Sequence, residues 1–150
     1  MQVGDIMTRD VKTAETDATF SDAAKILHEN RISSVIITEG GRTAGIVTER
    51  DLVNVVAEGL DPGQTTVGER MTRDLATVEV RTDIADAARL MAERRIRHLP
   101  VVYRDSLVGV ISISDLTNWA VEEMTGGHEL PDLERSQAAF AAHLEVKRGE

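Results

Sequence analysis

The sequence has no cysteine, only three prolines, and few aromatic residues: one tryptophan, one tyrosine and two phenylalanines among 150 residues. Without cysteine there is no disulfide, thiolate zinc site, cysteine nucleophile or iron–sulfur cluster. This usage fits a reducing compartment, and we expect a cytoplasmic protein. Basic residues are also few, with 17 Lys+Arg against 26 Asp+Glu and a formal net charge of −9. This balance, with only 3% aromatic residues, predicts no nucleic-acid partner.

Long hydrophobic runs are missing as well. No apolar stretch approaches the length of a membrane span, and the N-terminal segment carries acidic residues and no apolar core. We therefore expect neither a membrane partner nor a secretory signal. The hydrophobic content of 41% and charged content of 29% are ordinary for a folded chain. The length allows one domain of common size or two very small ones.

The most informative feature is an internal repeat. A shift of 64 residues places residues 3–56 on residues 67–120 without a gap, and 18 of the 54 aligned positions are identical. The block MTRD recurs at 7–10 and 71–74. Two copies indicate a pseudo-twofold pair rather than a solenoid, which needs three or more units. A duplication kept for packing alone would leave the same pattern and is compatible with a functional one.

Each copy predicts a short helical turn followed by the element order β-α-β-β-α. The turns start near Val3 and near Thr66, and extended pieces follow around Thr13 and Thr77. The first long helix of each copy has apolar residues at i, i+3, i+4 and i+7 after a capping residue, Thr19 or Asp83. Two apolar runs split by a polar turn then predict a hairpin, and a final helix follows.

This pattern predicts an α+β fold in which the two β-α-β-β-α repeats pack sheet to sheet with pseudo-twofold symmetry. Packing by the sheets would bury the face that each small sheet otherwise leaves wet. The expected boundaries are repeat 1 at 1–58, a linker at 59–66, repeat 2 at 67–122 and a C-terminal helical tail at 123–150. In the tail, Pro131 suits the first turn of a helix whose weak apolar stripe holds Leu133, Phe140 and Leu144. That helix packs on its own or a partner subunit, or it is a solvated end.

A motif of the form G-h-h-[T/S]-x-x-D-L, with h apolar, ends each predicted hairpin. It pairs Thr48 with Asp51 in repeat 1 and Ser112 with Asp115 in repeat 2. The hydroxyl and the carboxylate meet at a helix start, where free backbone N–H groups and the helix dipole favour anions. An aspartate there can accept two hydrogen bonds from a ribose diol. The same spacing is also a plain capping arrangement. Recurrence of glycine, hydroxyl and aspartate in register favours a nucleotide site, because packing would not obviously need all three.

With these hairpins and the run GIVTERDL at 45–52, residues 3–122 resemble a tandem pair of CBS domains, a Bateman module. The resemblance implies a standalone regulatory protein rather than an enzyme. It implies two clefts that bind AMP, ADP, ATP or a related adenosyl ligand as a regulatory ligand, with no catalytic cofactor. It also implies a homodimer that signals to an effector protein of unknown identity. The alternative is a non-binding structural or dimerisation scaffold with vestigial clefts.

The resemblance assigns site residues as well. The ribose-binding acids fall on Asp51 and Asp115, the hydroxyl positions fall on Thr48 and Ser112, and Arg50 matches a basic residue within reach of phosphate. Each cleft also takes residues from the other repeat. Those that join Asp51 are Thr77, Ile96, Arg97 and His98. Those that join Asp115 are Thr13, Ile32, Ser33 and Ser34. Because the basic side chains gather with Asp51, tighter phosphate binding is expected there than at Asp115.

Several other features have plain structural explanations. Arg94 and Arg95 fall at a predicted helix C-terminus, where cations favour the dipole. The four histidines show no metal-ligand spacing, so we expect no metal site. No nucleophile elbow, HExxH or Walker motif occurs, which makes an enzyme the least favoured class.

Overall fold

The computed structural model describes residues 1–126, so the predicted tail helix after Pro131 lies outside the described residues. Residues 1–115 form one compact unit that holds both sheets, and the chain from Leu116 onward belongs to a second unit. In the described part no helix combines the length and apolarity needed to cross a bilayer. The elements are α1 (Val3–Ile6), β1 (Thr13–Glu15), α2 (Phe20–Asn30), β2 (Ser34–Glu39), β3 (Arg42–Thr48), α3 (Glu49–Ala57), α4 (Val67–Arg70), β4 (Val78–Glu79), α5 (Ile84–Arg94), β5 (His98–Tyr103), β6 (Ser106–Ser112) and α6 (Ile113–Thr125).

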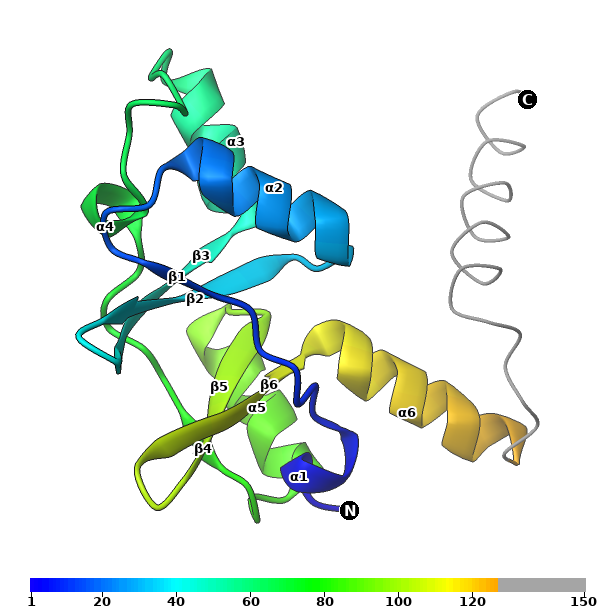
Figure 1. Cartoon of the computed structure of the whole chain (residues 1–150). Coiled ribbons are helices and arrows are strands. Elements are labelled where there is room, and N and C mark those ends of the chain that lie inside the picture. The colour runs from blue at the N-terminus through cyan, green and yellow to red at the C-terminus, as the bar shows by residue number, and fades with distance from the viewer. Residues whose placement is uncertain (127–150) are drawn as a thin grey trace, which may run out of the picture. The chain divides into compact units, whose positions relative to one another are not determined.

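This order confirms the β-α-β-β-α pattern in both repeats, each after a short helix (Figure 1). The long helices begin where the capping residues predict. Thr19 Oγ1 accepts a hydrogen bond from the Asp22 N–H at 3.1 Å, and Asp83 Oδ1 accepts one from the Ala85 N–H at 2.8 Å. Such bonds satisfy N–H groups that a helix start otherwise leaves free. Helix α6 runs to Thr125 and therefore continues through the expected boundary between 122 and 123.

Two three-stranded sheets form the centre of the fold, ordered β1-β2-β3 and β4-β5-β6. In each, the first strand is parallel to the middle strand and the last two make an antiparallel hairpin. Val35, Ile36 and Ile37 on β2 are all at most 1% exposed. Because side chains alternate along a strand, both faces of this sheet are covered. Helices α2 and α3 lie on one face and the second sheet on the other (Figure 1), which confirms packing sheet to sheet.

The second sheet differs from the first at its shortest strand. In the first sheet, the Ile36 N–H donates to the Lys12 carbonyl at 3.1 Å. Pro100 occupies the equivalent place on β5 and has no N–H to donate. The pairing of β4 with β5 therefore begins only at Val78 and Val101, and β4 contains only Val78–Glu79. Thr77, predicted to lie on this strand, instead precedes it.

The two repeats exchange their leading turns. The N–H groups of Val3 and Gly4 in α1 donate to carbonyls of the second repeat, Thr82 at 2.8 Å and Val80 at 2.9 Å. The N–H groups at the start of α4 donate in the same way to carbonyls of the first repeat, at Ala18 and Thr16. Val67 and Met71 are buried in the apolar cluster of the first repeat. Each short leading helix therefore packs with the repeat from which it is separated in the sequence.

Candidate functional site

The two motif carboxylates lie at matching strand-to-helix junctions, β3 into α3 and β6 into α6. Asp51 Oδ2 accepts from the Thr48 N–H at 2.8 Å and from its hydroxyl at 3.3 Å. Asp115 Oδ2 accepts the same two bonds from Ser112 at 2.7 and 3.0 Å. Both motifs therefore form capping boxes. Within residues 1–126, no hydrogen bond engages Oδ1 of either carboxylate, so this oxygen is free to accept one from a ligand.

The glycine of each motif has a packing role. A Cβ placed on Gly45 would lie 2.7 Å from both Met71 Sδ and the Thr72 carbonyl oxygen. Thr72 and Ile46 exchange two backbone hydrogen bonds, each 3.0 Å long. The chain that follows α4 therefore crosses β3 too closely for any side chain at position 45. On β6, Gly109 meets Met7 and Thr8 in the same manner.

The recurring MTRD block is explained by the same crossing. Its methionines pack on the motif glycines, and its threonines form the β-bridges to β3 and β6. The guanidinium of Arg9 donates to the Gly4 carbonyl at 3.0 Å, and that of Arg73 to the Gly68 carbonyl at 3.1 Å. The argument that packing would not need the motif glycine is therefore wrong, because the exchange of leading turns requires it.

The segments that enter the hairpins lie beside the motif helices of their own repeats. The Ser33 carbonyl accepts a hydrogen bond from the Glu49 N–H at 3.1 Å, and the Arg97 carbonyl accepts one from the Ile113 N–H at 3.0 Å. One residue further on, Ser34 is the register partner of Thr48 and His98 that of Ser112. Each entry segment is thus fixed at the first turn of a motif helix.

His98 connects the two repeats. Its Nε2 lies 2.7 Å from Ser33 Oγ, and both side chains are half-buried. Burial lowers the pKa of His98, the charges of Asp115 and Glu49 oppose that shift, and Arg97 adds to it. The family resemblance assigned His98 to the Asp51 group. The structure brings it to Ser33 and near Asp115, and also near Glu49, the first residue of the helix that carries Asp51.

Asp115 shares this environment. Burial raises the pKa of its carboxyl group, whereas the hydrogen bonds from Ser112 and the nearby His98 lower it. Glu49, the first residue of α3, also acts on His98 and was missed by the sequence analysis. Its counterpart in the second repeat is Ile113, so the repeat gave no signal for it. This end of the two motif helices therefore contains one imidazole between two acids.

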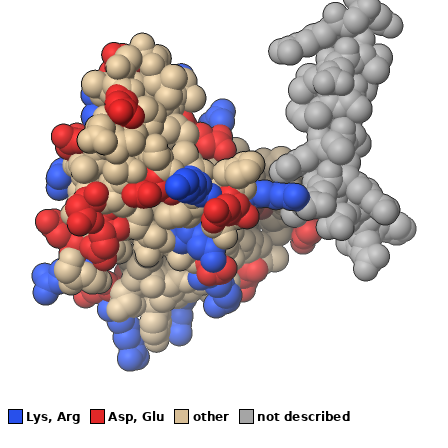
Figure 2. Space-filling model, turned by 45° about the horizontal axis from the view of Figure 1, so that its top comes forward, with Lys and Arg blue, Asp and Glu red and all other residues tan. Residues whose placement is uncertain are grey.

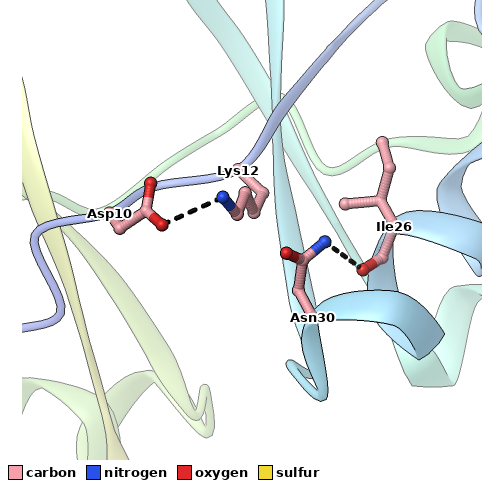
Figure 3. Close-up of polar contacts among 4 residues, drawn as sticks. All are labelled: Asp10, Lys12, Ile26 and Asn30. Atoms are coloured by element: carbon pink, nitrogen blue, oxygen red, sulfur yellow. Dashed lines mark hydrogen bonds and ion pairs between the residues drawn. The ribbon is translucent and has the colours of Figure 1, made fainter.

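The remaining predicted site residues differ in exposure. Thr13, Thr77, Arg50 and Arg97 are exposed, and Ile32, Ser34, Ile96, Thr48, Asp51 and Ser112 are half-buried. Two local contacts lie near predicted site residues of the first repeat, one before β1 and one at the end of α2 (Figure 3). The Lys12 ammonium, one residue before Thr13, pairs with Asp10 at 2.9 Å, and the Asn30 amide at the end of α2 donates to the Ile26 carbonyl at 2.8 Å. The cation next to Thr13 is thus already paired with an acid of the same segment.

The described residues carry mixed charge and no cluster of metal ligands. Both signs of charge are spread over the face drawn in Figure 2. Residues 1–126 contain no group of three or more histidine, aspartate or glutamate side chains placed to hold a metal ion. The described residues at these helix starts are thus carboxylates, hydroxyls and one imidazole, all of which donate or accept hydrogen bonds.

Comparison with known proteins gives a consistent result. The model of the family described as "CBS domain" matches residues 3–58 and 67–122. The CBS domain-containing protein YhcV of Bacillus subtilis is 35% identical over 124 residues, 82% of this chain and 86% of that protein. A putative signal-transduction protein with CBS domains from Burkholderia ambifaria has a TM-score of 0.78 and 34% identity, covering 81% of this chain and 94% of that one. The CBS domain pair of protein MJ0100, solved with 5′-methylthioadenosine and S-adenosyl-L-methionine, has a TM-score of 0.76 and 26% identity, covering 82% and 98%.

Proposed function

Because this chain belongs to the CBS domain family, we propose that it is a regulatory module that binds an adenosyl ligand and signals to a partner protein. The observation that carries the proposal is the pair of motif carboxylates, each of which holds a helix start with Oδ2 and leaves Oδ1 open. The open Oδ1 has two lone-pair sites and can accept hydrogen bonds from the hydroxyls of a ribose cis-diol. The adenosyl ligands bound by the MJ0100 pair, which is similar in fold and sequence, support this ligand class.

AMP, ADP and ATP are the ligands we propose within that class. Asp51 and Asp115 bind the ribose, and the hydroxyls of Thr48 and Ser112 together with helix-start N–H groups bind ribose or phosphate oxygens. Arg50 and Arg97 are exposed cations that supply charge for phosphate. The half-buried Ile32 and Ile96 provide apolar contacts for the base, and Thr13, Thr77, Ser33 and Ser34 add hydroxyl groups.

A non-binding scaffold is the second candidate, and one observation favours it. Packing alone explains the glycine, hydroxyl and aspartate of both motifs, since the glycines meet the crossing segments and the other two residues form capping boxes. Under this alternative the recurrence of the motif reflects the fold and carries no information about a ligand.

A homodimer is proposed under either function, with a second copy on α3. Val53 and Val56 are 58% and 60% exposed, and Leu60 just after the helix is 39% exposed. Val53 and Val56 are three residues apart in α3 and therefore lie on one side of the helix. A twofold axis would pair this apolar stripe with itself.

Isothermal titration of the full chain with AMP, ADP, ATP and 5′-methylthioadenosine tests the proposed function. Asp51→Ala and Asp115→Ala should each weaken binding at their own site about tenfold or more, because hydrogen bonds to a charged group contribute about 1.5–3 kcal/mol. Asp22→Ala is the matched control, since Asp22 completes a capping box on α2 outside the site. If none of these ligands binds to the folded chain, the scaffold is the better account.

A further inference from the structure

The Ser33–His98 contact is a polar bridge between the two repeats, and one of its partners is a titratable imidazole. Its 2.7 Å separation joins the hydroxyl at the end of one entry segment to the imidazole at the start of β5. In register, His98 pairs with Ser112, the residue that shares the cap of Asp115. The bridge therefore includes Ser33 and lies beside Ser112, both of which are proposed to bind a ligand.

The direction of this hydrogen bond depends on the protonation of His98. A neutral imidazole that carries its proton on Nδ1 accepts a hydrogen bond at Nε2. The Ser33 hydroxyl is then the donor of this hydrogen bond. A protonated imidazole carries N–H on both nitrogens, so Nε2 donates to Ser33 Oγ. The hydroxyl hydrogen of Ser33 is then free to donate elsewhere. Protonation thus adds a positive charge and a second donor at the same place.

The charged groups around His98 come from three segments of the chain. Asp115 lies in the first turn of α6, Glu49 in the first turn of α3, and Arg97 directly precedes His98 in the chain. The two acids favour the protonated imidazole, whereas Arg97 and burial oppose it. An anionic ligand beside His98 would act in the same direction as the acids. By linkage, a ligand that favours the protonated form binds more tightly where that form is populated.

We infer that His98 makes the choice among adenosyl ligands depend on pH, through the charge of the 5′ substituent. Acidification favours a ligand with an anionic 5′ substituent, such as a phosphate, over ligands with a neutral or cationic one. This inference rests on the proposed function, because it concerns the same site. It gives His98, beside Ser33 and Asp115, a share in phosphate recognition in addition to that of Arg50 and Arg97.

The test is isothermal titration of the full chain at about pH 8 and about pH 5.5, a range that brackets the ordinary histidine pKa. The probes are AMP, with an anionic 5′ phosphate, 5′-methylthioadenosine, with a neutral thioether, and S-adenosylmethionine, with a cationic sulfonium. His98→Gln is the test variant, because an amide can still hydrogen-bond to Ser33 but cannot gain a charge. His28→Gln is the matched control, since His28 is exposed on α2.

The phosphate of AMP itself titrates near pH 6, so the quantity of interest is wild type relative to His98→Gln. We expect the AMP affinity ratio of wild type to variant to rise at least about fivefold on acidification, the lower end of ordinary coupling between two sites. The corresponding ratio for 5′-methylthioadenosine should stay constant, that for S-adenosylmethionine should fall, and His28→Gln should follow wild type.

Two results would overturn the inference, and they differ. If AMP binds with the same pH dependence in wild type and His98→Gln, the imidazole does not gate the site although the proposed function stands. If none of the three probes binds at either pH while circular dichroism shows folded protein, the proposed function fails and the inference fails with it.

Discussion

Replacing Gly45 by alanine tests the exchange of leading turns on which this fold depends. Gly45 lies on β3 with no positive φ, so alanine could adopt its backbone conformation without strain. The obstacle is steric, because the new Cβ would lie 2.7 Å from Met71 Sδ and from the Thr72 carbonyl oxygen. The sulfur belongs to a buried side chain, and the oxygen accepts the Ile46 N–H at 3.0 Å. Relief therefore requires the crossing segment to move away from β3.

The size of the effect follows from two opposing contributions. Overpacking of a close-packed interior costs about 1–3 kcal/mol. Loss of glycine flexibility in the unfolded chain offsets about 0.4–1 kcal/mol of this. We therefore expect Gly45→Ala to lower the free energy of unfolding by about 1–2 kcal/mol, and the Tm by about 5–10 °C for a unit of this size.

Thermal and urea unfolding, followed by circular dichroism, measure this change. Gly109→Ala should behave alike, because its Cβ would meet Met7 and Thr8 in the same way. Gly63→Ala is the control, since Gly63 is exposed and its nearest contact is the Asp61 side chain at 3.3 Å. If Gly45→Ala were no less stable than Gly63→Ala, the segment after α4 would not cross β3 as the structure has it, and the reasoning would be refuted.

Two further predictions concern charge and assembly. Burial raises the pKa of Asp115, so its contribution to stability is complete below the unfolded-state pKa and is lost as the pH rises through the folded-state pKa. Asp115→Asn keeps an acceptor for the Ser112 N–H and does not ionise. In urea titrations its stability relative to wild type should therefore rise as the pH is raised from about 4 to about 7.5, and a relative fall would contradict the role of burial. Val53→Glu should shift the proposed dimer to monomer in multi-angle light scattering without lowering the Tm. Asn54→Glu adds the same charge at the neighbouring exposed position and should leave the dimer intact. A monomeric wild type would refute the α3 interface.

Features set by short stretches of sequence were predictable. Thr19 and Asp83 begin helices because a side-chain oxygen three or fewer residues away satisfies a free N–H, which the sequence displays directly. The hairpins follow from apolar runs around polar turns. The late start of β4 was also predictable in principle, because Pro100 stands in the middle strand and lacks the N–H that its counterpart Ile36 uses.

Features that depend on how the two repeats meet were not predictable. Nothing near Val3 or Val67 indicates that each short helix packs on the other repeat, since the partner carbonyls lie far away in the chain. His98 is similar, because its contact with Ser33 spans 65 residues and depends on the relative placement of the repeats. Pattern within one repeat fixes neither contact.

The two explanations of the motif, cap and ligand site, use different atoms of the same carboxylate. Oδ2 of Asp51 or Asp115 is bound to the N–H and hydroxyl of the capping residue, whereas Oδ1 is left for a further donor. A ligand diol could therefore bind without uncapping the helix. Conversely, a chain that had lost its ligand would still retain both carboxylates to hold α3 and α6. Stability alone is thus sufficient to maintain the motif, so its recurrence does not distinguish a sensor from a scaffold. Binding measurements on Asp51→Ala and Asp115→Ala do, with Asp22→Ala as the control that shows what loss of a helix cap alone does to binding.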